Sequence, residues 1–102
     1  MKTFKNFKEA HEYYNYSSSY RFGTTYNSMG VIRSYSNGTK DIYKNDNIFY
    51  YEIKNDKIKE AFRKTKINKK KLRLFYRKKD KVLDMGLYQV DKFYKNYVKL
   101  IK

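Results

Sequence analysis

The side chains that can do chemistry together in this chain are its basic and its aromatic residues. The basic ones gather in residues 63–73, and tyrosine is in excess, with 13 in 102 residues. Lys and Arg neutralise phosphate groups, while the flat face of Tyr stacks on nucleobases and its hydroxyl forms hydrogen bonds. Cations combined with aromatic rings are typical of surfaces that bind nucleic acid.

The charge is also unevenly distributed along the chain. The net charge is +15, and residues 57–102 hold 17 Lys and Arg residues against 4 Asp and Glu, whereas residues 1–56 hold 8 against 6. Positive charges at this density repel one another in the folded state, so a polyanion is the expected partner. The candidate phosphate-binding residues are Arg63, Lys64, Lys66, Lys69, Lys70, Lys71, Arg73, Arg77, Lys78 and Lys79.

The composition excludes several classes of protein and site. There is no Cys and a single His, so we expect neither disulfides nor a metal site, and no cofactor. No stretch approaches the roughly 20 apolar residues of a membrane span, and no known catalytic motif is present. We therefore expect an intracellular binding protein, in the cytoplasm or the nucleus, with no catalytic residues.

The elements that must position these residues follow from hydrophobic periodicity. Residues 1–14 predict a short helix, residues 15–19 a loop and residues 20–25 a short strand. Asn55 is a helix N-cap, and the apolar spacing after it predicts a helix ending near Thr65. Further strands are predicted over 29–35, 39–43, 48–53, 72–77, 82–94 (broken at Gly86, with Leu87 and Val90 buried) and 97–101.

These elements predict one domain over residues 1–102, with a helix and loop in 1–19 and a small barrel in 20–102. The fold class is α+β, a pseudo-barrel of about six short strands with one or two short helices.

The last third of the chain resembles a known family. Asp84, Gly86, Leu87, Tyr88 and Val90, followed by an aromatic pair at 93–94, are similar to the closing strands of the SRA domain, with Met85 inserted. The SRA domain belongs to the PUA-like superfamily of pseudo-barrels. Residues 41–51 are similar to the acidic turn and aromatic strand of that family. The resemblance covers about residues 30–100.

The resemblance implies the reading of a base, often a modified one. SRA domains flip a methylated or hydroxymethylated cytosine out of the duplex and hold it between aromatic rings, at a cost of a few kcal/mol for the flip. Carried over by position, Tyr50 or Tyr51 supplies one ring, Tyr35 or Tyr43 supplies the other, and Asp41 reads the edge of the base. Because adjacent strand residues face opposite sides, only one of Tyr50 and Tyr51 can line the pocket.

The family's large loops have no room here, since only residues 54–56 separate the aromatic strand from the helix. The partner therefore stays open between DNA, which the resemblance favours, and RNA, single strands or a modified nucleotide. One alternative is a small basic ribonuclease similar to the RelE-type toxins, with Arg73, Arg77 and Tyr88 as its candidate catalytic residues. Another is a module that uses its charge to bind an acidic protein.

Overall fold

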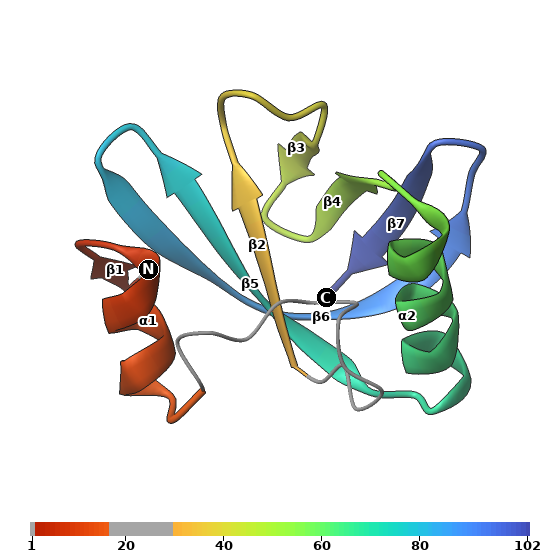
Figure 1. The fold of residues 1–102 in the computed structure, drawn as a ribbon, viewed down its shortest axis with the longest axis horizontal. Helices are drawn as coiled ribbons and strands as arrows, with labels where there is room; N and C mark the ends of the chain where they lie inside the picture. Colours follow the sequence, from red (N-terminus) through yellow and green to blue (C-terminus); the bar gives the residue numbers. More distant parts are fainter. Residues whose placement is uncertain (1, 17–29) are drawn as a thin grey trace.

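The computed structural model describes residues 2–16 and 30–102. These residues form a curled, half-barrel sheet with one helix on either side of it (Figure 1). In chain order the elements are β1 (Thr3–Phe4), α1 (Phe7–Tyr13), β2 (Val31–Tyr35), β3 (Ile42–Asn45), β4 (Ile48–Glu52), α2 (Asp56–Ile67), β5 (Lys71–Lys78), β6 (Lys81–Phe93) and β7 (Tyr97–Ile101). The expected α+β half-barrel is therefore present, and the strand predicted over 20–25 lies outside the described residues.

The sheet has the order β2-β5-β6-β7-β4-β3, and β1 pairs with β6 at its side. Strands β2 and β5 run parallel, with Val31 opposite Arg73, while the other described pairs are antiparallel. Strands β2 and β3 are the two ends of this path. The turn of residues 36–41 joins them, so this turn lies where the half-barrel is open.

Helix α1 is shorter than the apolar spacing of residues 1–14 predicts. The side chain of Asn6 accepts a hydrogen bond from the backbone N–H of Glu9 at 2.8 Å and so caps the helix, which begins at Phe7. Phe4, which the spacing places on the helix, lies instead in β1 and pairs with Val82 of β6. Asn6 is the sequence signal for this later start.

Helix α2 begins where the sequence indicates. The side chain of Asn55 accepts from the N–H of Ile58 at 2.8 Å, and the helix ends at Ile67, two residues beyond the predicted end. Ala61, Phe62 and Thr65 form its buried stripe. The stripe faces the sheet, which leaves the basic side chains of the helix on the solvent side.

The sheet has a hydrophobic core on both faces, because each helix covers part of one of them. Leu72 and Leu74 of β5 are fully buried in the larger cluster, which includes Ala61 and Phe62 of α2. The opposite cluster contains Phe75, with Phe7 and Ala10 of α1. Adjacent residues of a strand alternate between faces, so β5 contributes to both cores.

Strand β6 corrects two predictions around Gly86. The strand is continuous, and Gly86, with φ +92°, forms a bulge in which Met85 and Gly86 face Leu74 alone. The extra residue shifts the alternation of side chains. Met85 and Tyr88 are therefore buried, whereas Leu87, predicted to be buried, is 43% exposed. The burial of Val90 is confirmed.

Candidate functional site

The predicted base-pocket residues fall into two groups. Asp41 and Tyr51 lie together at the open side of the half-barrel, where the turn of residues 36–41 meets the end of β4. Tyr35 lies near them at the end of β2, but its ring is on the other face of the sheet, against Phe7 of α1. Tyr43 and Tyr50 lie elsewhere.

Asp41 is the centre of the first group, and its carboxylate is held in place by two hydrogen bonds. The buried hydroxyl of Ser34 donates to Oδ2 at 2.6 Å, and the backbone N–H of Glu52 donates to Oδ1 at 2.7 Å. The turn itself is closed by Thr39, whose hydroxyl donates to the carbonyl oxygen of Tyr35 at 2.8 Å. A carboxylate has about four acceptor positions, so Asp41 retains capacity for a further donor.

Tyr51 lies close to this carboxylate on the inner face of β4. Its pKa is raised above the ordinary range of tyrosine, first by burial and then by the negative charge of Asp41 and the neighbouring Tyr35. The ring is 6% exposed. Phe62 contacts it with ring centroids 5.4 Å apart, and the amine of Lys54 lies 4.7 Å from its centre. The ring is therefore neutral, closely packed and in contact with an exposed cationic side chain.

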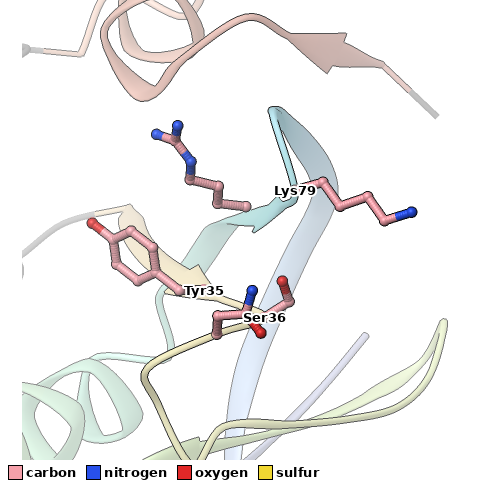
Figure 2. Close-up of a pocket in the computed structure, with 5 residues that line it drawn as sticks. Tyr35, Ser36 and Lys79 are labelled. Carbon is pink, nitrogen blue, oxygen red and sulfur yellow. The ribbon is translucent and has the colours of Figure 1, made fainter.

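Tyr35 is the exposed partner of this group. It is 40% exposed, and its ring rests edge-on against Phe7 of α1 at 5.3 Å. It also lines a cavity of about 160 Å³ together with Ser36, Asn37, Arg77 and Lys79. Figure 2 shows Tyr35 and Lys79 on opposite sides of this cavity, with their polar ends pointing apart. One candidate base contact and two candidate phosphate contacts thus share one cavity.

Tyr76 is a member of the site region that the sequence reasoning did not assign. Burial raises its pKa first, and the charge of Asp41 adds to this effect. Its ring stacks on Tyr43 at 6.1 Å with an interplanar angle of 17°, and the Tyr43 hydroxyl donates to Asp46. The signal for Tyr76 is its alternation with Leu72 and Leu74, which puts the three side chains on one face of β5.

Tyr50 faces away from the pocket. It lies on the outer face of the sheet, opposite Ile42 of β3 and Lys99 of β7. The expectation that Tyr50 and Tyr51 face opposite sides is therefore confirmed, and only Tyr51 reaches Asp41.

The predicted phosphate-binding residues are divided between the two ends of β5. Arg63, Lys64 and Lys66 lie on the exposed side of α2, and Lys69 to Lys71 continue into the turn before β5. Arg77, Lys78 and Lys79 lie at the far end, about 20 Å away at the usual strand rise. A continuous run of charge in the sequence thus becomes two basic regions.

Arg73 differs from the other members of this set because it is already paired. Its Nη1 donates to both oxygens of Asp84 at 3.0 and 2.9 Å, and its guanidinium lies 3.9 Å from the centre of the Tyr14 ring. Asp84 also accepts from the N–H of Gly86 at 2.9 Å and from the Tyr14 hydroxyl. The arginine side chain is only 18% exposed. It points away from the buried Leu72 and Leu74 and lies under Tyr14, directly after α1.

The residues of the ribonuclease alternative are separated by the fold. Tyr88 is fully buried, and its hydroxyl donates to the carbonyl oxygen of Asp46 at 3.1 Å. Arg73 is held by Asp84, and Arg77 lines the cavity at the other end of β5. Within residues 2–16 and 30–102, no group of His, Cys, Asp and Glu side chains is placed to hold a metal ion, and no helix there has the length and apolar character to cross a membrane.

Comparison with known proteins gives structural neighbours only. No family model matches the chain, and no curated protein matches it. Three solved structures of the SUVH5 SRA domain are similar. The complex with fully methylated CG DNA has a TM-score of 0.66 and 16% identity, over 95% of this chain and 84% of that one.

The complexes with methylated CHH DNA and hemi-methylated CG DNA have TM-scores of 0.62 and 0.58, with 18% and 20% identity. These matches cover 71% and 72% of this chain, which spans 62% and 63% of the two SRA chains. The resemblance inferred from residues 84–94 is thereby confirmed at the level of the fold. The chain has the fold of an SRA domain.

Proposed function

We propose that the chain is a DNA-binding module that takes a flipped-out, modified base at the open side of the half-barrel, against Tyr51 and with Tyr35 at the rim of the site. Asp41 reads the edge of the base, and basic residues hold the phosphate backbone. DNA is preferred over RNA, because the neighbouring SRA structures are complexes with methylated DNA. An intracellular location, in the cytoplasm or the nucleus, follows from such a partner.

The observation that carries this proposal is the fixed carboxylate of Asp41 beside Tyr51. Ser34 and the N–H of Glu52 orient both of its oxygens before any ligand arrives. An ionised carboxylate only accepts hydrogen bonds, and the exocyclic amino group of cytosine is a donor. Asp41 therefore favours cytosine over thymine, whose corresponding group is an acceptor.

Stacking on Tyr51 and contact with Tyr35 at the rim supply the remaining energy for the flip. Extrusion of a base costs a few kcal/mol, and contact with aromatic faces and the edge of the base must offset it. The exposed ring of Tyr35 is available as it stands. A base that stacks on Tyr51 displaces the amine of Lys54, which is exposed and can turn to a phosphate instead.

Arg77 and Lys79 are the phosphate contacts nearest to the base, since they share the cavity with Tyr35. The basic residues of α2 and the turn after it reach the backbone farther along the duplex. Arg73 is paired with Asp84, so it links β5 to β6 and does not contact the phosphate backbone. No cofactor or metal ion is needed for this binding, and no catalytic step is assigned.

Two other functions remain less well supported. The ribonuclease alternative needs Arg73, Arg77 and Tyr88 on one open surface, and Tyr88 is fully buried. The acidic-protein alternative explains the basic charge, yet it assigns the oriented carboxylate of Asp41 no role beyond closing the turn.

Fluorescence anisotropy with labelled oligonucleotides tests the proposal. The ligands are duplexes with plain, methylated or hydroxymethylated cytosine, single-stranded DNA and RNA, each at low and near-physiological salt. We expect a preference of about tenfold for one modified duplex, equivalent to about 1.4 kcal/mol, that survives the higher salt. Equal binding to every ligand that disappears with salt would leave only a basic surface and overturn the base-reading function.

Tyr35→Ala is the variant to combine with this experiment. The side chain is 40% exposed, so its removal spares the buried cores. The variant is expected to bind plain duplex as before and to lose its preference for the modified one.

A further inference from the structure

A second cavity lies on the outer face of the sheet, away from Asp41. It has a volume of about 450 Å³ and is lined by Ile42, Lys44, Tyr50, Tyr94 and Tyr97. We call it the outer groove. Its volume falls in the range of about 300–1,000 Å³ that is usual for ligand sites. Strands β3, β4 and β7 and the turn between β6 and β7 supply its residues.

The groove presents aromatic rings rather than a mixed polar surface. The rings of Tyr50 and Tyr94 lie 6.1 Å apart at 57°. Tyr94 is 44% exposed, and its backbone N–H donates to the carbonyl oxygen of Tyr97 at 2.7 Å, which fixes the turn that carries both residues. The rings are thus held on a rigid support with accessible area, as a stacking platform requires.

Cations surround these rings. Lys44 lines the groove, the amine of Lys92 lies 5.4 Å from the centre of the Tyr94 ring, and Lys99 lies opposite Tyr50 on β7. The acidic residues near this face are Asp91, which is 3.7 Å from Lys99, and Glu52, which lies opposite Tyr97. The lysines therefore favour an anionic occupant, consistent with the net charge of +15.

We propose that the outer groove binds unpaired nucleotides of a single strand, by stacking bases on Tyr50, Tyr94 and Tyr97 while the lysines contact the phosphates. A duplex hides the faces of its bases, so the groove selects single strands. DNA and RNA share this chemistry. The groove is separate from the pocket around Asp41, because Tyr50 and Tyr51 face opposite sides of β4. This site therefore adds a second binding mode and does not depend on base flipping.

Anisotropy with labelled single strands, ten thymidines or ten uridines long, tests this site. Tyr94→Ala is expected to weaken binding of a single strand about tenfold, which is about 1.4 kcal/mol and within the range of one stacked base. Tyr94→Phe keeps the ring and should bind within about twofold of the wild type. The thymidine and uridine strands decide whether the groove distinguishes DNA from RNA.

Tyr13→Ala is the matched control, because Tyr13 is an exposed tyrosine on α1, and its loss should leave single-strand binding unchanged. Tyr50→Leu removes a second ring of the groove and should also weaken binding. If Tyr94→Ala and Tyr50→Leu both bind single strands like the wild type, or if the wild type binds none, the site does not exist.

The two proposed sites can be tested independently. Tyr94→Ala should keep its preference for duplexes with a modified cytosine, whereas Tyr35→Ala should lose that preference and keep single-strand binding. A variant pair with this crossed pattern supports two sites. Loss of both activities in each variant would show one shared site and overturn the assignment of the outer groove.

Discussion

The backbone N–H of Glu52 donates a hydrogen bond to Oδ1 of Asp41 at 2.7 Å. This bond joins the turn after β2 to the end of β4, across the open side of the half-barrel. One carboxylate thus closes the turn and faces the proposed base site. The orientation of Asp41 is set by the fold itself, since Ser34 holds the second oxygen.

Asp41→Asn should abolish discrimination between cytosine and other bases while the chain still folds. The amide oxygen can take the N–H of Glu52, and the Ser34 hydroxyl can rotate to accept from the amide nitrogen. The amide presents an N–H donor where the carboxylate had its second acceptor oxygen, and it lacks the negative charge that favours the amino group of cytosine. Preference for a duplex with modified cytosine over one with thymine at the same position should fall about tenfold, in the range of about 1–3 kcal/mol for one base contact, as measured by anisotropy.

Asp80→Asn is the matched control for this variant. Asp80 lies in the exposed turn between β5 and β6, and its substitution changes the net charge by the same amount. A preference that survives in Asp41→Asn, or falls equally in Asp80→Asn, would argue against base reading by Asp41.

Asp84→Asn should destabilise the fold by about 2–4 kcal/mol, because it leaves the Arg73 guanidinium without its counter-charge under α1. Urea denaturation followed by far-ultraviolet circular dichroism measures this change. Glu60→Gln breaks an ion pair with Arg63 whose side chains are 56% and 49% exposed. Its cost should stay below about 1 kcal/mol, and equal costs in the two variants would contradict a buried role for Arg73.

Removal of both Arg77 and Lys79 should change the salt dependence of duplex binding. Each phosphate contact adds about one to the slope of log affinity against log salt, so the variant with Ala at both positions should have a slope lower by about two. Lys57→Ala removes an exposed charge outside the candidate set and should leave the slope nearly unchanged. A slope that is the same in the double variant and the wild type would remove Arg77 and Lys79 from the interface.

Alkaline solution should destabilise the protein through its buried tyrosines. Burial raises the pKa of Tyr88 to about 12, above its ordinary value of about 10. A raised pKa means that the folded state binds the proton more tightly than the unfolded state. This stabilisation is therefore complete below pH 10 and is lost as the pH rises from about 10 towards 12.

Ultraviolet absorbance of the phenolate and urea denaturation at several pH values test this prediction. Tyr88→Phe removes the titrating hydroxyl and should lose less stability than the wild type between pH 10 and 12. Equal losses in the two proteins would show that other groups dominate the alkaline transition.

Local signals in the sequence were sufficient for most elements of the fold. The N-cap at Asn55 and the alternation in β5 act within a few residues, so they can be read directly. The bulge at Gly86 could not be located in this way. A glycine is compatible with several backbone conformations, so its presence alone does not predict a bulge. Only the pairing of β6 with β5 determines that Met85 and Tyr88, rather than Leu87, are buried.

The site was harder to predict than the fold, because its residues depend on contacts between distant segments. The resemblance to the SRA domain named Tyr35, Asp41, Tyr43, Tyr50 and Tyr51, and the fold places Asp41 next to Tyr51 only. It did not indicate that Ser34 and the N–H of Glu52 orient the carboxylate. The charge of Arg73 suggested a phosphate contact, and nothing local indicated that Asp84, beyond the next turn, would take it.

The parallel pairing of β2 with β5 has a consequence for synthesis of the chain. Val31 pairs with Arg73, and Thr3 pairs with Leu83, so the first strands to leave the ribosome find their neighbours only in the second half of the polypeptide. The nascent first half cannot close its sheet, and folding waits for late, non-local contacts, which slow it. The two halves are in this sense complementary fragments, each of which lacks the partner strands that the other supplies.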